Sequence, residues 1–211
     1  LFLATIAAII ASLAFPRADI ALSTLFYLPD KGFYLEWHPF LRGTYLAVRY
    51  VTMVYVGALL LAGIGRACGV RIIPWRSWCY LLAVLLVGPL LLVEAVCKDY
   101  VHRPRPREIV EFGGTQAYAP PLTIGETQGK SFVSSHAAMG FYVVAFAFLF
   151  RGRRRTALYV TGTTLGSFLG ILRIMQGGHF ATDILFAGLI MLWTIHGLAW
   201  IMLQNYSKAE D

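Results

Sequence analysis

Arg173-Ile-Met-Gln-Gly-Gly-His179-Phe-Ala-Thr-Asp183 is the stretch around which the chain is organised, because it lies between two long apolar segments, at one end of each. His179 and Asp183 are four residues apart, so a helix that begins near His179 places both on one face, one turn apart. The carboxylate can then accept the proton of one imidazole nitrogen and leave the other nitrogen free as a nucleophile. The Gly pair allows a bend and the close approach of a ligand, and Arg173 offers a planar fork to phosphate oxygens. The competing interpretation is a solvated histidine at a membrane end.

The composition indicates a helical membrane protein. Of the 211 residues, 58% are hydrophobic and 14% are charged, and the mean hydropathy of +0.65 is too high for a soluble domain of this size. A single domain over residues 1–211 is the simplest division. The net charge of +7 could indicate nucleic-acid binding. Its cations, however, cluster just outside apolar segments, where they set orientation or bind anionic lipid.

Apolar segments predict an all-α polytopic bundle of about six transmembrane helices. The predicted spans are Leu1–Phe15, Thr44–Gly65, Ser77–Cys97, His136–Phe150, Thr156–Ile174 and Asp183–Leu203. Residues 1–43 are then a first span plus a segment, residues 16–43, whose aromatic and charged residues are typical of a layer along the membrane surface. That segment could also help to cover a lipid-binding cleft. Residues 44–203 hold the core helices and active-site loops, and residues 204–211 form a polar tail.

Several residues inside the predicted spans need an explanation. Pro89 is expected to kink its helix, and Glu94 is placed to pair with Lys98 one turn later. Arg49 either extends to the membrane surface or faces a substrate phosphate. His196 is interpreted as a hydrogen-bonded packing residue.

The arginine distribution predicts the orientation. The connections at residues 66–76 and 151–155 together hold seven Arg and no Asp or Glu, so the positive-inside rule places both in the cytoplasm. The long connection at residues 98–133 and the residues 177–183 then lie on the opposite face. In the inner membrane of a Gram-negative cell that face is periplasmic. Because the long connection is also basic, its cations need another role.

Three polar stretches meet this outer face. They are Lys98-Asp-Tyr-Val-His-Arg-Pro-Arg105-Pro106, Ser131-Phe-Val-Ser134-Ser135-His136, and the stretch from Arg173 to Asp183. Three cations, two serines at a helix start and two histidines suit a transferring phosphoryl group. One histidine could attack phosphorus while the other protonates the leaving oxygen. The first stretch alone could instead be a basic loop that binds lipid headgroups. No metal-ligand spacing is present, so no metal or other cofactor is expected.

The three stretches together resemble the signature of the type 2 phosphatidic acid phosphatase family. Lys98 to Pro106 matches K-x6-R-P, Ser134-Ser135-His136 matches P-S-G-H, and Arg173 to Asp183 matches S-R-x5-H-x3-D. The chain departs from the signature at three positions, with Val133 for Pro, Ser135 for Gly and Leu172 for Ser. No acid, base or cation position is missing.

The resemblance implies a metal-independent membrane enzyme. It implies that His179 forms a phosphohistidine, that Asp183 orients it and that His136 is the general acid. The implied phosphate-binding residues are Lys98, Arg105, Ser134 and Arg173, with Ser135 keeping a backbone N–H at the Gly position.

The resemblance also limits the substrate to a membrane lipid phosphate. Further positive charge beside the signature suits a large anionic headgroup, which the following residues are expected to contact: His102, Arg103, Arg107 and Lys130. The chain looks most like family members that act on the 1-phosphate of lipid A. Alternatives are undecaprenyl pyrophosphate, phosphatidylglycerol phosphate, or transfer to an acceptor hydroxyl. An anion transporter or lipid-binding protein would explain the cations but not the His/Asp pair beside a second His. The lipid and the bilayer are the expected partners, with neither nucleic acid nor an obligate protein partner.

Overall fold

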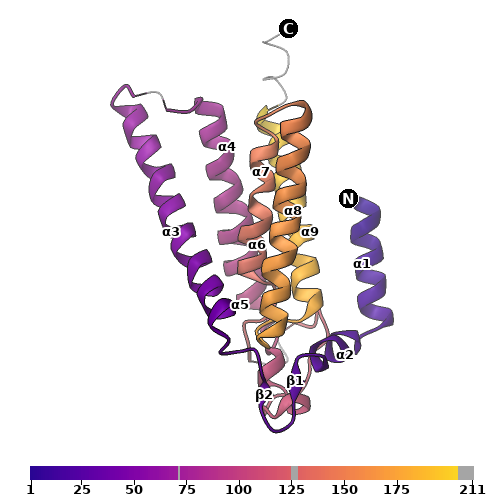
Figure 1. The fold of residues 1–211 in the computed structure, drawn as a ribbon. Coiled ribbons are helices and arrows are strands. Elements are labelled where there is room, and N and C mark those ends of the chain that lie inside the picture. Colours follow the sequence, from indigo (N-terminus) through magenta and orange to yellow (C-terminus); the bar gives the residue numbers. More distant parts are fainter. Residues whose placement is uncertain (71, 125–127, 204–211) are drawn as a thin grey trace.

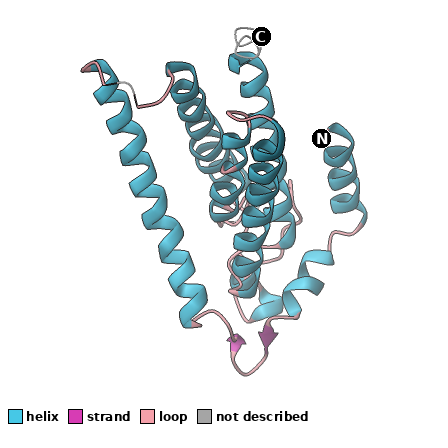
Figure 2. Ribbon diagram, turned by 45° about the horizontal axis from the view of Figure 1, so that its top comes forward, coloured by secondary structure: helices cyan, strands magenta, loops and turns pink. Residues whose placement is uncertain are grey.

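A computed structural model describes residues 1–70, 72–124 and 128–203, and it is almost entirely helical (Figures 1 and 2). The elements in chain order are α1 (Phe2–Ala14), α2 (Ala18–Thr24), β1 (Tyr27–Leu28), β2 (Gly32–Phe33), α3 (Pro39–Ala67), α4 (Trp75–Leu85), η1 (Leu86–Cys97), α5 (Lys98–Val101), η2 (Pro106–Glu108), η3 (Val110–Phe112), α6 (Ser135–Tyr142), α7 (Val144–Ala147), α8 (Gly152–Met175) and α9 (Ala181–Leu203). The strands β1 and β2 form one antiparallel hairpin. The predicted all-α membrane bundle is confirmed, while the predicted tail, residues 204–211, lies outside the described residues.

Fewer helices could cross a membrane than the six predicted. Among the described residues, four helices are long and apolar enough: Pro39–Ala67, Trp75–Glu108, Gly152–Met175 and Ala181–Leu203. The pair α1 and α2, bent by 82°, makes a fifth if counted as one span. The predicted span at residues 136–150 is instead the shorter apolar helix Ser135–Ala147. At a rise of 1.5 Å per residue it falls short of a hydrocarbon core of about 30 Å.

The short helix α6–α7 lies in the centre of the bundle and packs against both α8 and α9 (Figure 1). A Cβ atom at Gly140 of α6 would lie 2.6 Å from the Cα atom of Gly166 in α8, so the two backbones are in contact. Such close approach of small residues is how helices associate when lipid surrounds them. It brings the start of α6 beside the end of α8, which carries Arg173.

The helix that precedes the long connection widens around its proline. After α4, the chain continues as the π-helix η1, which contains Pro89. A proline removes one backbone donor and displaces the preceding carbonyl, and a wider helical turn is a common local response. Glu94 accepts from Lys98 at 2.7 Å, as predicted. His196 in α9 is a packing residue, also as predicted: its Nδ1 lies 2.7 Å from the carbonyl oxygen of Leu192.

The N-terminal segment packs against the long connection, at the end of the bundle that carries α5 and the start of α9 (Figure 1). Phe33 of β2 is buried in a cluster with Ile109, Phe112 and Phe180, and the rings of Phe33 and Phe112 are 5.2 Å apart. The position of residues 16–43 along the membrane surface stays a prediction. The contacts show that the segment also packs on the long connection and on Phe180, next to His179, which favours the alternative in which it helps to cover the site.

The helix α3 stands apart on one side of the bundle (Figure 1). Only 6% of its apolar window is buried inside the protein. An apolar helix with so little internal packing is compatible with a lipid environment, since lipid tails replace the missing contacts. Between α3 and the α4–η1 helix runs an open groove, which is described with the site.

Candidate active site

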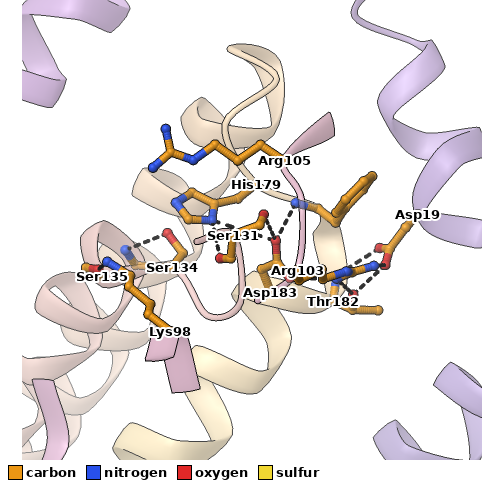
Figure 3. A network of polar contacts seen from close by, with 12 residues as sticks. Asp19, Lys98, Arg103, Arg105, Ser131, Ser134, Ser135, His179, Thr182 and Asp183 are labelled. Atoms are coloured by element: carbon orange, nitrogen blue, oxygen red, sulfur yellow. Dashed lines mark hydrogen bonds and ion pairs between the residues drawn. The ribbon is translucent and has the colours of Figure 1, made fainter. Parts of the chain in front are cut away.

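The three sequence stretches converge at one end of the bundle (Figure 3). The end of η1 and α5 supply Lys98, the start of α6 supplies the serines and His136, and the turn between α8 and α9 supplies His179. Their convergence follows from the helix packing, because α6 lies against α8 and α9 and η1 lies against α6. The sequence prediction that these stretches share one face of the bundle is confirmed.

His179 is buried, with 4% of its surface exposed, and its ring is held by a backbone carbonyl. Its Nδ1 lies 2.7 Å from the carbonyl oxygen of Ser131 and 3.7 Å from Oδ2 of Asp183. A carbonyl oxygen can only accept, so Nδ1 must carry the proton and Nε2 keeps its lone pair. The predicted pairing of His179 with Asp183 is present, at 3.7 Å. The Ser131 carbonyl is a second partner of Nδ1, and it is the one at hydrogen-bond distance.

Asp183 is fully buried and organises the residues around His179. Its Oδ2 accepts from the Ser131 hydroxyl at 2.6 Å and from the Phe180 backbone N–H at 2.8 Å. The second bond closes the first turn of α9, as an acidic residue at the third helical position commonly does. Through Ser131, the carboxylate also fixes the carbonyl that holds His179.

Burial lowers the pKa of His179, because a charged imidazolium loses its hydration there. The nearby Asp183 carboxylate opposes this shift, and the positive charges of Arg173 and Arg105 add to it. The net direction favours the neutral ring near pH 7. A neutral imidazole with a free Nε2 is the form that can attack phosphorus.

Arg173 is buried beside the Gly pair. Its Nη1 donates to Oε1 of Gln176 at 2.5 Å, and its Nε has no hydrogen-bond partner among the described residues. A Cβ atom at Gly178 would lie 2.3 Å from Nη2 of Arg173, and Gly177 adopts a φ of +62°. The Gly pair therefore makes room for the guanidinium and for a left-handed turn. A buried donor without a hydrogen-bond partner destabilises the folded protein. An anion bound here could accept the missing hydrogen bond from Nε of Arg173.

Arg105 and Arg173 line the same cleft, of about 220 Å³, together with Arg107 and Glu36. Figure 3 shows Arg105 beside His179. A phosphate dianion in front of Nε2 would meet these positive groups, which can hold its equatorial oxygens.

Lys98 and Ser135 form a second polar group on the other side of His179 (Figure 3). Lys98 donates to the Ser135 hydroxyl at 2.5 Å and to Glu94 at 2.7 Å, and Ser135 also donates to Glu94. Ser134 caps α6 and is fully buried: its hydroxyl accepts from the backbone N–H of Ala137 at 3.4 Å. The Ser134 hydroxyl thus stabilises the helix start that faces the cleft.

His136 lines an apolar groove and lies against Tyr45, which lines both this groove and the cleft. Its ring stacks on Tyr45 of α3, with centroids 4.5 Å apart, and its Nε2 is 3.4 Å from the Tyr45 carbonyl oxygen. The groove, of about 580 Å³, continues between α3 and α4–η1. It is lined mainly by apolar side chains, with Arg49 and Glu94 as charged members. Of the two alternatives for Arg49, the one in which it faces the site fits this position.

The four expected headgroup contacts lie in different environments. Arg107 is half-exposed and donates to Glu36 at 2.7 Å, and Lys130 is 64% exposed and lies 3.3 Å from Asp99. His102 begins the left-handed turn after α5. The predicted headgroup contact of Arg103 is wrong. None of its surface is exposed, and its guanidinium binds Asp183 at 2.6 Å and Asp19 at 2.7 Å. It cannot contact a headgroup, because protein atoms surround it.

Sequence reasoning missed Asp19, Ser131 and Tyr45 as parts of the site. Ser131 stood inside a recognised stretch, but only the fold shows that its carbonyl meets His179. Asp19 binds a residue 84 positions away, and no local pattern reports such a pairing. Within the described residues, no group of three or more His, Cys, Asp or Glu side chains could hold a metal ion.

Comparison with known proteins finds one superfamily profile and several relatives that are named lipid phosphatases. The sequence profile of the PAP2 superfamily matches residues 76–208. The lipid A 4'-phosphatase of Francisella tularensis subsp. novicida (strain U112) is 31% identical over 195 residues, covering 88% of both chains. The lipid A 4'-phosphatase of Rhizobium leguminosarum is 30% identical over 116 residues, which cover 53% of this chain and 48% of that protein. Phosphatidylglycerophosphatase B of Bacillus subtilis (strain 168) is 26% identical over 129 residues, 58% of this chain and 59% of that protein. No solved structure matches the chain.

Proposed function

The chain belongs to the PAP2 superfamily and is a membrane lipid phosphatase, and from this premise we propose that it works through a phosphohistidine at His179. The observation that carries the proposal is the state of the His179 ring. Its Nδ1 proton is directed at the Ser131 carbonyl, so the lone pair is on Nε2. The ring lies beside Arg105 (Figure 3), which lines the cleft together with Arg173. The transport and lipid-binding alternatives assign no role to this lone pair.

The proposed reaction has two steps. In the first, Nε2 of His179 forms a bond to phosphorus, the bond from phosphorus to the lipid oxygen breaks, and His136 gives that oxygen a proton. In the second, water attacks phosphorus, the P–N bond breaks, and His136 takes the proton from the water. Throughout, the Nδ1 proton stays on the ring, where the Ser131 carbonyl and the Asp183 carboxylate stabilise the positive charge.

The proposed substrate is lipid A, with the 4'-phosphate in the cleft. The expected preference for the 1-phosphate is replaced here, because a relative that aligns along most of both chains is named a lipid A 4'-phosphatase. Phosphatidylglycerol phosphate is the second candidate, since phosphatidylglycerophosphatase B also matches. The apolar groove beside His136 can accept an acyl chain of either lipid.

We also propose that the site faces the periplasm from the inner membrane. The arginine-rich connections after α3 and after α7 lie at the opposite end of the bundle from the hairpin and the site (Figure 1). The positive-inside rule places that arginine-rich end in the cytoplasm.

The test measures phosphate release by the purified protein in detergent with excess chelator. Lipid A, phosphatidylglycerol phosphate, undecaprenyl pyrophosphate and phosphatidic acid are compared, and mass spectrometry of the lipid A product identifies which phosphate was removed. We expect loss of the 4'-phosphate, radiolabel from the phosphate trapped on the wild-type protein, and neither in His179→Ala. Label that remains on His179→Ala would overturn the phosphohistidine, and loss of the 1-phosphate alone would overturn the substrate.

Transfer to an acceptor hydroxyl shares the first step, so the same assay is repeated with a soluble alcohol. Hydrolysis predicts that free phosphate remains the main product. A phosphorylated alcohol as the main product would make the protein a transferase.

A further inference from the structure

We propose that Arg103 is a positioning residue for the reaction at His179, and that Asp19 holds Arg103 in place from the N-terminal segment. This inference rests on the proposed function, because the position of Asp183 matters for catalysis only if His179 is the nucleophile. Asp19 lies outside residues 76–208, the part that the superfamily profile matches. The N-terminal segment would then be a working part of the active site rather than an added anchor.

The guanidinium of Arg103 is bound on every side (Figure 3). Its Nη1 donates to Oδ1 of Asp183 at 2.6 Å and its Nη2 to Oδ2 of Asp19 at 2.7 Å. Its Nε donates to the carbonyl oxygen of Ala119 at 2.9 Å, and its Cζ atom lies over the ring of Phe180, 4.3 Å from the centroid. A planar guanidinium with this many fixed partners has one orientation available.

Asp19 and Thr182 close a ring with Arg103. The Thr182 backbone N–H donates to Asp19 at 3.0 Å, and the Thr182 hydroxyl donates to Asp19 and accepts from Arg103. Thr182 directly precedes Asp183. This closed set of hydrogen bonds therefore holds the backbone next to the Asp183 carboxylate, which pairs with His179. Charge-assisted hydrogen bonds in a buried setting are among the stronger interactions available to a protein.

The two carboxylate oxygens of Asp183 have different partners. Oδ1 is held by Arg103, while Oδ2 holds Ser131 and lies 3.7 Å from Nδ1 of His179. When Nε2 takes the phosphoryl group, the ring gains positive charge, and a fixed carboxylate at this distance stabilises it. Without Arg103 the Oδ1 atom would lose its cation, and only the bonds to Oδ2 would hold the carboxylate. Arg103 is fully buried, so its loss should act on the turnover step and not on substrate binding.

The experiment compares Asp19→Asn with Asp30→Asn in the full chain in detergent, using whichever lipid phosphomonoester the wild type hydrolyses fastest. Asp30 is an exposed carboxylate in the turn between β1 and β2, and it serves as the matched control. We expect Asp19→Asn to lower kcat about 10- to 100-fold, the equivalent of one charge-assisted hydrogen bond, with KM unchanged. Asp30→Asn should match the wild type.

A double-mutant cycle separates positioning from general stability. Arg103→Met leaves two buried carboxylates without their cation, so it should lower kcat more than Asp19→Asn does. Asp19→Asn combined with Arg103→Met removes one of those carboxylates. Its kcat should therefore be higher than the product of the two single effects predicts. Where Asp19→Asn does not yield folded protein, Thr182→Val, which removes only the bridging hydroxyl, should lower kcat at constant KM.

The outcomes distinguish the proposed lipid phosphatase function from the proposed positioning role of Arg103 and Asp19. A wild type that hydrolyses none of the four lipids would overturn the proposed function, and this inference with it. An active wild type with equal kcat in Asp19→Asn and Asp30→Asn would overturn this inference alone. Strict additivity in the cycle, or a rise in KM at constant kcat, would likewise exclude a positioning role for Arg103.

Discussion

At the scale of single residues, the site depends on where one proton lies. The Ser131 carbonyl fixes the Nδ1 proton of His179, and burial lowers the pKa of the same ring. Both effects leave Nε2 unprotonated near neutral pH, which is the form a nucleophile requires. A serine backbone, rather than the neighbouring carboxylate alone, therefore sets the tautomer in this chain.

The pH dependence of phosphoenzyme formation follows from that pKa. A lowered pKa means that the nucleophile is lost only as pH falls below the ordinary histidine value of about 6.5. Protonation of His179 should therefore lower the rate of radiolabel incorporation only below about pH 6.5. Arg105 contributes to the lowering, so in Arg105→Gln the fall should begin at a higher pH.

The control for this profile is Lys130→Gln, which removes an exposed cation paired with Asp99. Its pH profile should match that of the wild type. A wild-type rate that already falls at pH 7, or an Arg105→Gln profile that does not move, would contradict the assignment of His179.

At the scale of elements, α3 contributes more than a membrane span. Its Tyr45 stacks on His136, and its inner face forms one wall of the groove that leads away from the site. The other wall includes η1, where the wider turn around Pro89 occurs. The two helices together form the walls of a groove that reaches His136.

Filling the groove should separate long-chain from short-chain substrates. Met53 lines the groove, whereas Val54 is 73% exposed on α3. Met53→Trp should raise KM for a lipid phosphate with long acyl chains about tenfold, because the added ring occupies space that a chain needs. Hydrolysis of a dihexanoyl analogue should change little.

Val54→Trp is the matched control, and it should leave KM for both substrates unchanged. Equal effects of Met53→Trp on the long and short substrates would contradict the use of this groove by the acyl chain.

At the scale of the whole molecule, the two ends of the bundle differ in chemistry. One end carries the site and the N-terminal hairpin, and the other carries the arginine-rich connections (Figure 1). This polarity gives the proposed periplasmic orientation a direct test, because Cys68 is exposed beside the arginine-rich connection after α3.

Labelling of intact cells with a membrane-impermeant maleimide measures the orientation. In a chain with Cys79→Ala and Cys97→Ala, Cys68 should be protected until the inner membrane is opened. With Cys68→Ala added, Lys130→Cys should react at once after the outer membrane is made permeable, since Lys130 is 64% exposed near the site. Labelling in the reverse order would place the site in the cytoplasm.

The sequence by itself determined the fold class and the unequal charge of the two ends of the bundle, and it indicated the residues proposed to carry the chemistry. Apolar runs of helical length report burial or lipid contact wherever they occur. The spacings from Lys98 to Arg105 and from Arg173 to Asp183 are local and can be read along the chain. The Glu94–Lys98 pair and the packing role of His196 were predictable for the same reason, since partners within one helical turn are fixed by local geometry.

The tertiary structure decided what no spacing encodes. Only the packing of α6 into the centre of the bundle explains why its helix can be too short to span a membrane. Arg103 looked like one more surface cation, yet contacts from two distant segments, through Asp19 and Asp183, bury it completely. The burial of a charge depends on partners brought together from far along the chain, and a sequence shows the charge but not those partners.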